Sequence, residues 1–131
     1  MIIPYISGDL REVSASVLAY IGDSVYELYA RCWVAEHSSA KSGQMHKMAI
    51  KYVSAKSQSM FLTRLSDEDF FSDDELDVIR RARNNTSKAH PKNTDIITYK
   101  RSTGLECLIG SLRINNNDNR IKEIMEFIVG D

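Results

Sequence analysis

The chain has 131 residues, of which 43% are hydrophobic and 27% charged, and its net charge is −1. Such a composition excludes disordered and fibrous proteins, and the length suits one hydrophobic core, so we expect a single domain over residues 1–131. Apolar runs fall short of the roughly 20 residues of a membrane helix, and the first residues lack a basic signal region, so we expect a cytoplasmic protein without membrane contact.

The first predicted element is a helix from Ser14 to about Glu36. Its apolar residues recur at steps of three and four, as on a helix with one buried stripe: Leu18, Ile21, Val25, Leu28 and Cys32. Cys32 and Cys107 both lie in apolar segments without metal-ligand spacing. We therefore expect both to be reduced thiols in the core.

A polar segment, His37–Gln44, separates this helix from a second one, which the periodicity predicts from about Met45 to Leu65. Ser66 and Ser72 are each followed three residues later by an acid, a pattern typical of helix starts. The next predicted helix runs from Asp73 to about Asn84. We expect its inner face to consist of Leu76, Ile79 and Ala82.

The region 84–93 has the composition of a loop, and 95–99 is a β-branched run that we expect to lead, extended, into a helix from about Lys100 to Ile114. After a turn at 115–119, a closing amphipathic helix ends near Gly130. The inward residues of these last two helices are predicted to be Leu105, Leu108, Ile109 and Leu112, then Ile121, Ile124, Met125 and Ile128. The fold class is therefore all-α, a helical bundle.

Charges of one sign are grouped along the chain. Residues 41–64 hold five basic residues and no acid, residues 67–77 hold seven acids and no base, and residues 80–101 hold seven basic residues against Asp95 alone. Such blocks indicate either solvated faces or a basic surface that meets a polyanion.

Two acids stand inside apolar helices beside glycines. Asp23 directly follows Gly22, and Glu106 lies between Gly104 and Gly110. Glycine is a poor helix residue, which indicates a close approach of another helix or of a ligand. If the two glycine faces pack together, the carboxylates converge and a hard divalent ion, Mg²⁺ or Mn²⁺, would offset their repulsion. The alternative is two partly exposed acids, each paired with Arg or Lys.

These segments resemble a known family. YIGDSV (Tyr20–Val25) and LECLIG (Leu105–Gly110) are similar to the two acidic motifs of the ribonuclease III family. Further segments are typical of its Mini-ribonuclease III branch: VSAKSQ (Val53–Gln58), RRARN (Arg80–Asn84) and PKNTD (Pro91–Asp95). The resemblance runs from about Ser14 to Ile114 and leaves no segment for a separate double-stranded-RNA-binding domain.

The resemblance implies a fold and a reaction. It implies the helical endonuclease domain of ribonuclease III, active as a homodimer that hydrolyses double-stranded RNA and leaves a 5′ phosphate. Asp23 and Glu106 would be the catalytic residues and hold Mg²⁺, with Mn²⁺ able to substitute, and the substrate would be precursor 23S ribosomal RNA. Two family acids are replaced here, by Ala19 and Thr103, which leaves more of the ion's shell to water and phosphate.

The basic segments are the expected RNA contacts, because duplex RNA is recognised mainly through its shape and phosphates. The predicted contacts are Lys47, Lys51, Lys56, Arg81, Arg83, Asn84, Lys88, Lys92 and Lys100. Glu27, one turn after Asp23, is either an indirect contributor or a surface acid. The rival function is a non-catalytic RNA-binding or ribosome-associated module, against which the presence of both Asp23 and Glu106 argues.

Overall fold

The computed structural model describes residues 13–38, 41–85 and 95–130, and within these ranges it contains helices and no strand. The all-α prediction is therefore confirmed. The helices are α1 (Ala15–His37), α2 (Ser42–Val53), α3 (Ala55–Asp67), α4 (Asp73–Asn85), α5 (Ile96–Ile114) and α6 (Asp118–Val129). No helix in the described part of the chain is both long enough and apolar enough to cross a membrane.

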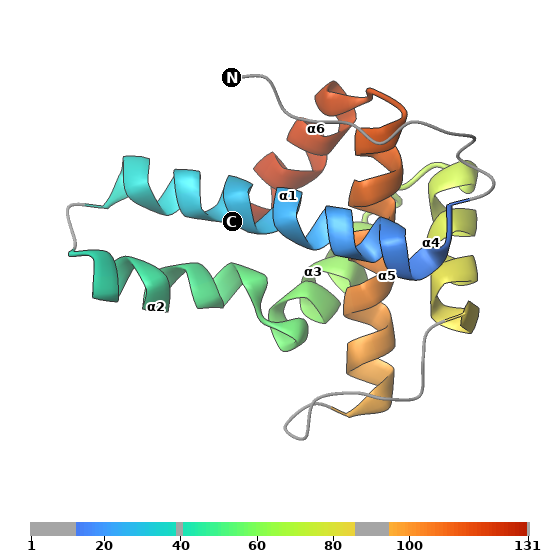
Figure 1. Cartoon of the computed structure of the whole chain (residues 1–131), viewed down its shortest axis with the longest axis horizontal. Helices are drawn as coiled ribbons and strands as arrows, with labels where there is room; N and C mark the ends of the chain where they lie inside the picture. Colours follow the sequence, from blue (N-terminus) through green and yellow to red (C-terminus); the bar gives the residue numbers. More distant parts are fainter. Residues whose placement is uncertain (1–12, 39–40, 86–94, 131) are drawn as a thin grey trace.

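Helix α5 is the central element. It packs against α1, α3, α4 and α6, and Figure 1 shows α1 crossing it while α2 runs beside α1. Every residue of α5 from Ser102 to Arg113 is buried except Glu106, which is half-buried. The predicted inward residues of α5 and α6 are all buried, and Phe61, Leu62 and Leu65 of α3 complete the same core.

The crossing of α1 and α5 depends on two glycines. A Cβ added at Gly22 would overlap the backbone carbonyl oxygen of Glu106 and lie 2.8 Å from the amide nitrogen of Gly110. A Cβ added at Gly110 would overlap the carbonyl oxygen of Leu18. The two helices therefore touch backbone to backbone, as the glycines predicted. Gly104 is different, because it faces Ile79 of α4 instead of α1.

The prediction of one helix over 45–65 was wrong, because the chain turns at Ser54 between α2 and α3. Ser54 is extended (φ −64°, ψ 151°), and its Oγ accepts a hydrogen bond from the amide of Ser57 at 3.2 Å. This N-cap begins a new helix inside a continuous apolar period. The break lets α2 follow α1 while α3 turns to pack on α5.

Two other element boundaries differ from the prediction. The run 96–99 is not extended but forms the first turn of α5, because the Asp95 carboxylate caps the amide of Thr98 at 2.8 Å. Ser66 does not start a helix. It lies in the last turn of α3, and Asp69, with a positive φ of 55°, reverses the chain behind it.

The predicted helix start at Ser72 is confirmed, and the Glu75 carboxylate that caps it also binds Arg120 of α6. The Ser72 amide donates to Glu75 Oε1 (2.9 Å) and the Glu75 amide donates to Ser72 Oγ (3.2 Å), a reciprocal cap. Arg120 of α6 donates two hydrogen bonds of 2.8 Å to the same carboxylate. Burial would raise the pKa of Glu75, but the hydrogen bonds from Arg120 and Ser72 outweigh it and lower the pKa.

The inner faces of α1 and α4 are not where periodicity placed them. The buried residues of α1 are Gly22, Tyr26, Ala30 and Val34. Leu28 and Cys32 of the predicted stripe are exposed, so Cys32 is not a core thiol, whereas Cys107 is buried as expected. On α4, Ile79 and Ala82 are buried, but Leu76 is 41% exposed. The glycine contact decides the rotation of α1, which leaves Leu18, Ile21 and Val25 of the predicted stripe half-buried and Leu28 and Cys32 exposed.

The glycine contact gives the first testable prediction. Gly22→Ala should lower the free energy of unfolding by about 3 kcal/mol or more, because its methyl group must displace backbone atoms of α5. Gly110→Ala should behave alike. The control is Gly43→Ala on α2, where a Cβ meets nothing within 4 Å; it should leave stability unchanged or raise it by about 0.5 kcal/mol. Equal effects at Gly22 and Gly43 in urea denaturation would contradict the backbone contact.

Candidate active site

The structure brings Asp23 and Glu106 together, as the sequence predicted. Asp23 is the residue after Gly22 on α1, and Glu106 is the residue whose carbonyl oxygen faces that glycine. Their carboxyl groups lie close enough for Asp23 to raise the pKa of Glu106. The Asp23 side chain is exposed and that of Glu106 is half-buried, so the pair lies at the rim of the crossing with one side open to solvent.

The Glu106 carboxyl group is held neutral. Its pKa is raised from 4.5 to about 9, first by burial and then by the hydrogen bond to Asp23 and the charge of Asp23. The charge of Glu27 adds a smaller effect in the same direction, and only the Gln58 amide lowers the pKa. Because a second negative charge beside Asp23 is unfavourable in this half-buried place, Glu106 keeps its proton at neutral pH.

The wall behind the pair comes from α1, α2 and α3. Tyr26 is fully buried one turn after Asp23, and its hydroxyl donates a 2.6 Å hydrogen bond to the carbonyl of Tyr52 on α2. Burial and the neighbouring Glu106 raise the Tyr26 pKa, so its proton stays on. Gln58 of α3 is 2% exposed and faces Glu106. Tyr26 and Gln58 thus border the buried side of Glu106.

The two carboxyl groups would suit a hard divalent cation that takes only a few of its ligands from the protein. Within the described ranges, no three His, Cys, Asp or Glu side chains gather into a metal-binding group. Asp23 and Glu106 are the two carboxyl groups that could hold such an ion, since Ala19 and the buried Thr103 carry no carboxylate. A divalent ion bound by both would relieve the repulsion between them.

Glu27 has a partner of its own. Arg31 Nη2 donates to Glu27 Oε1 at 2.7 Å, an ion pair between residues four apart on the surface of α1. The pair agrees with the interpretation of Glu27 as a surface acid. Its charge still reaches Glu106, as the pKa of Glu106 shows.

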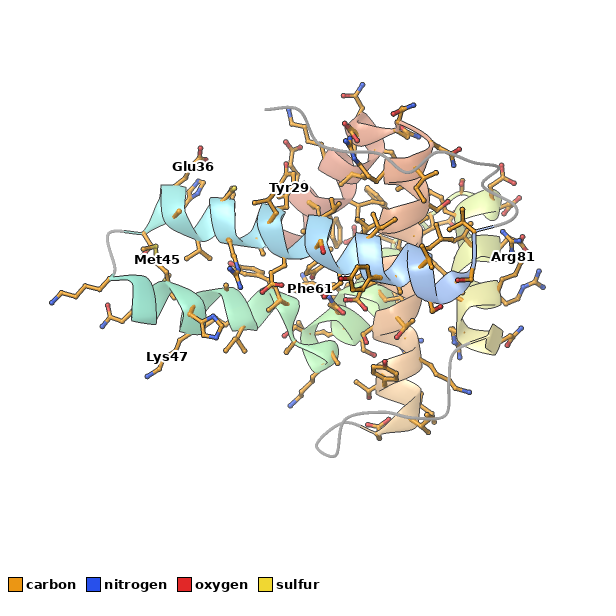
Figure 2. All side chains as sticks on the ribbon, in the orientation of Figure 1. Tyr29, Glu36, Met45, Lys47, Phe61 and Arg81 are labelled. Carbon is orange, nitrogen blue, oxygen red and sulfur yellow. The ribbon has the colours of Figure 1, made fainter. Side chains whose placement is uncertain are left out.

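Of the predicted RNA contacts, seven are described and two, Lys88 and Lys92, lie outside the described residues. Those with exposed side chains are Lys47, Lys51, Lys56, Arg81, Arg83 and Asn84, and Lys100 is half-buried. Figure 2 shows Lys47 on α2 and Arg81 on α4 far apart along the molecule. The basic segments thus flank the structure instead of forming one patch.

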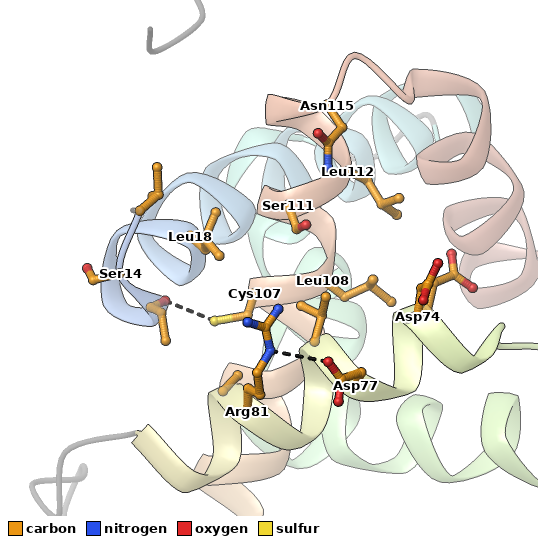
Figure 3. Close-up of a pocket in the computed structure, with 15 residues that line it drawn as sticks. Ser14, Leu18, Asp74, Asp77, Arg81, Cys107, Leu108, Ser111, Leu112 and Asn115 are labelled. Carbon is orange, nitrogen blue, oxygen red and sulfur yellow. Dashed lines mark hydrogen bonds and ion pairs between the residues drawn. The ribbon is translucent and has the colours of Figure 1, made fainter. Parts of the chain in front are cut away.

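Arg81 lies over a separate cleft. This cleft, of about 500 Å³, lies between the start of α1, α4 and α5, and Arg81 borders it beside Asp77, to which it is paired at 3.4 Å (Figure 3). On its floor the Cys107 thiol donates to the Ala15 carbonyl at 2.9 Å. The cleft shares no residue with the carboxyl pair.

Gln58 is a buried residue beside the carboxyl pair for which the sequence predicts no role. A signal was present, because Gln58 precedes Phe61, Leu62 and Leu65 at helical spacing and is the polar member of the buried face of α3. The apolar period was taken as continuous from Met45, and Gln58 does not belong to the face that this longer helix would bury.

The proton on Glu106 gives a pH-dependent prediction for Glu106→Gln in EDTA. In the folded protein Glu106 keeps a proton that it releases above pH 4.5 in the unfolded chain. The free energy of unfolding of the wild type should therefore be highest below pH 4.5 and fall as the pH rises toward about 9. Glutamine does not titrate. In urea denaturation the variant should therefore gain stability over wild type steadily across this range. A difference that does not change with pH would show that Glu106 ionises normally.

Comparisons with known proteins agree with this geometry. Residues 16–117 match the model of the Ribonuclease III domain. The chain is 38% identical over 120 residues to a Mini-ribonuclease 3 of Staphylococcus aureus, covering 92% of this chain and 90% of that protein. It is 35% identical over 122 residues to a Mini-ribonuclease 3 of Clostridium tetani, covering 92% and 80%.

The fold has a relative among solved structures. The crystal structure of a Fusobacterium nucleatum protein superposes with a TM-score of 0.82 at 25% identity, covering 95% of this chain and 98% of that one. The matched region of the Ribonuclease III domain contains both Asp23 and Glu106. Fold, site and sequence agree, and this chain belongs to the ribonuclease III family, in its Mini-ribonuclease III branch.

Proposed function

We propose how this ribonuclease III family member cuts double-stranded RNA: Asp23 and Glu106 together hold one or more divalent ions, Mg²⁺ or Mn²⁺, at the crossing of α1 and α5. The observation that carries this proposal is the crossing of α1 and α5, which places the half-buried Glu106 beside Asp23, so that burial and the nearby Asp23 raise the pKa of Glu106. A divalent ion there would polarise the scissile phosphate and lower the pKa of an attacking water, and hydrolysis would leave a 5′ phosphate.

Asp23 and Glu106 have different roles in this proposal. Glu106 is half-buried and bordered by Tyr26 and Gln58, so it would hold the ion from the buried side. Asp23 is exposed on α1 and faces the side from which a phosphate must approach. The replacements at Ala19 and Thr103 keep the remaining ligand positions free for water and for the RNA itself.

Exposed cations on either side of the site would hold the RNA backbone. We propose contacts from α2 and α3 (Lys47, Lys51 and Lys56), from the end of α4 (Arg81, Arg83 and Asn84) and from Lys100, with Lys88 and Lys92 between them in the sequence. Since Lys47 and Arg81 lie far apart, a duplex touching both would run along the length of the molecule (Figure 2).

We propose that a second copy of the chain covers the outer face of α1, giving a homodimer whose two sites cut opposite strands. This face lines a groove of about 750 Å³ with mostly apolar walls: Val25, Leu28, Tyr29, Cys32 and Trp33 of α1, and Ile121 and Val129 of α6. Charges of both signs border it, Glu36, Arg113, Asp118 and Glu126. Mixed charges around an apolar patch suit self-pairing about a two-fold axis.

Four large aromatic residues, Trp33, Phe61, Phe70 and Phe71, are candidates for this interface, and their positions in the structure differ. Phe61 and Phe71 are buried in the core of a single chain, and Phe70 packs on Phe127 and Arg120. Trp33 alone of the four borders the groove, where it stacks on His37. Trp33 is therefore the one of these four that we place at the dimer interface, beside Tyr29 of the same groove.

The substrate we propose is the precursor of 23S ribosomal RNA, cut in the cytoplasm by residues 1–131 as one catalytic domain. The support is the Mini-ribonuclease III membership together with a site built for phosphodiester chemistry. The rival function, a non-catalytic RNA-binding module, predicts binding without cutting. A duplex RNA incubated with the protein and Mg²⁺, with EDTA as control, separates the two.

The carboxyl pair gives the sharpest test of this function. Asp23→Asn keeps the side-chain shape but removes the charge that binds the ion, so cleavage in Mg²⁺ should fall by at least about 100-fold. Duplex affinity and its dependence on salt should persist, because the cations are untouched. The matched control is Asp67→Asn at the exposed end of α3, which should cut normally. Near-normal cleavage by Asp23→Asn would mean that the segment after Gly22 is structural.

The same variant tests the dimer. If two sites cut opposite strands, a mixed dimer purified from co-expressed wild-type and Asp23→Asn chains should nick one strand of the duplex and leave the other whole. Cleavage of both strands by such a mixed preparation at the wild-type rate would contradict the two-site dimer.

A further inference from the structure

Gln58 is the buried polar group that the site leaves unexplained. It is 2% exposed and lies one turn into α3, among the apolar residues Phe61 and Leu62. Its Nε2 is buried and makes no hydrogen bond within the described structure. A buried amide without a partner destabilises a protein, and an apolar side chain of similar volume would avoid that cost. Its presence points to a partner that arrives when the site is loaded.

The position of α3 aims this amide at the carboxyl pair. Ser54 caps the helix at its start, and two bonds from Arg101 of α5 fasten it: Nε donates to Ser59 Oγ at 3.1 Å and Nη2 donates to Thr63 Oγ1. Ser59 is the residue after Gln58. The Gln58 amide therefore faces Glu106 of α5, and its Nε2 has no hydrogen-bond partner within the described structure.

The Glu106 carboxyl group is the acceptor that this buried amide faces, and Glu106 lies beside Asp23 at the open side of the crossing. A carboxylate that binds a divalent ion keeps further lone pairs, and these can accept a hydrogen bond from an amide N–H. Carboxylates that bind metals are commonly held by such a second hydrogen bond.

We propose that Gln58 is a positioning residue that orients the Glu106 carboxylate toward the divalent ion by donating a hydrogen bond from Nε2 when the ion is bound. This inference rests on the ion site proposed above. It adds a third helix to the site: α1 supplies Asp23, α5 supplies Glu106, and α3 sets the angle of Glu106. The break at Ser54, which starts α3 afresh, then serves the chemistry as well as the fold.

The test is Gln58→Met, which keeps the volume and removes the donor. Mn²⁺ binding is measured without RNA by electron paramagnetic resonance of the free ion. The dissociation constant should rise about 10- to 100-fold. In EDTA the thermal unfolding temperature should stay equal to that of wild type or rise, because a buried unpaired donor is gone. A side chain that only filled the core would change stability and leave Mn²⁺ binding alone.

The control for the substitution is Gln44→Met on α2, where the glutamine is exposed and Mn²⁺ binding should not change. Gln58→Leu provides a second variant, with the same expectation, if the methionine variant folds poorly. Wild-type affinity for Mn²⁺ in a folded Gln58 variant overturns the role of Gln58. Asp23→Asn distinguishes the two failures: if it too binds Mn²⁺ like wild type, the ion site itself is wrong.

Discussion

The backbone contact between α1 and α5 at Gly22 and Gly110 is the constraint on which the rest of the structure depends. Each glycine faces a backbone carbonyl of the other helix, so no side chain can separate them. Asp23 follows the first glycine, and Glu106 contributes the carbonyl that the first glycine touches. The closest approach of the two helices therefore also brings the two carboxyls together. Fold and site share one contact.

That contact has an electrostatic cost that only the function accounts for. Packing Asp23 beside a half-buried Glu106 forces one of them to keep a proton at neutral pH. A stable protein without a task for these groups would place an uncharged residue there. Gln58 repeats the pattern, since its buried amide lacks a partner within the described structure. Active sites commonly concentrate such unfavourable groups, which become favourable when the ligand binds.

Most of the helices, most of the core and the carboxyl pair could be predicted from the sequence, because each depends on the pattern of residues within one segment. Leu105, Leu108, Ile109 and Leu112 repeat at helical spacing, and a glycine next to an acid inside an apolar helix is unusual enough to notice. Prediction failed where tertiary contacts override the pattern. The stripe of Leu28 and Cys32 has the stronger periodicity, yet the glycine contact rotates it outward. The N-cap at Ser54 is hidden inside a continuous apolar period, and Gln58 was missed with it.

The central claim is that the α1–α5 crossing places Asp23 and Glu106 to hold a divalent ion. Anomalous X-ray diffraction from a crystal of the protein soaked in Mn²⁺ locates such an ion directly. The account predicts the strongest anomalous peak between the carboxylates of Asp23 and Glu106. A site empty of anomalous density, with the ion bound instead at the acidic start of α4 around Asp73 and Asp74, would contradict it.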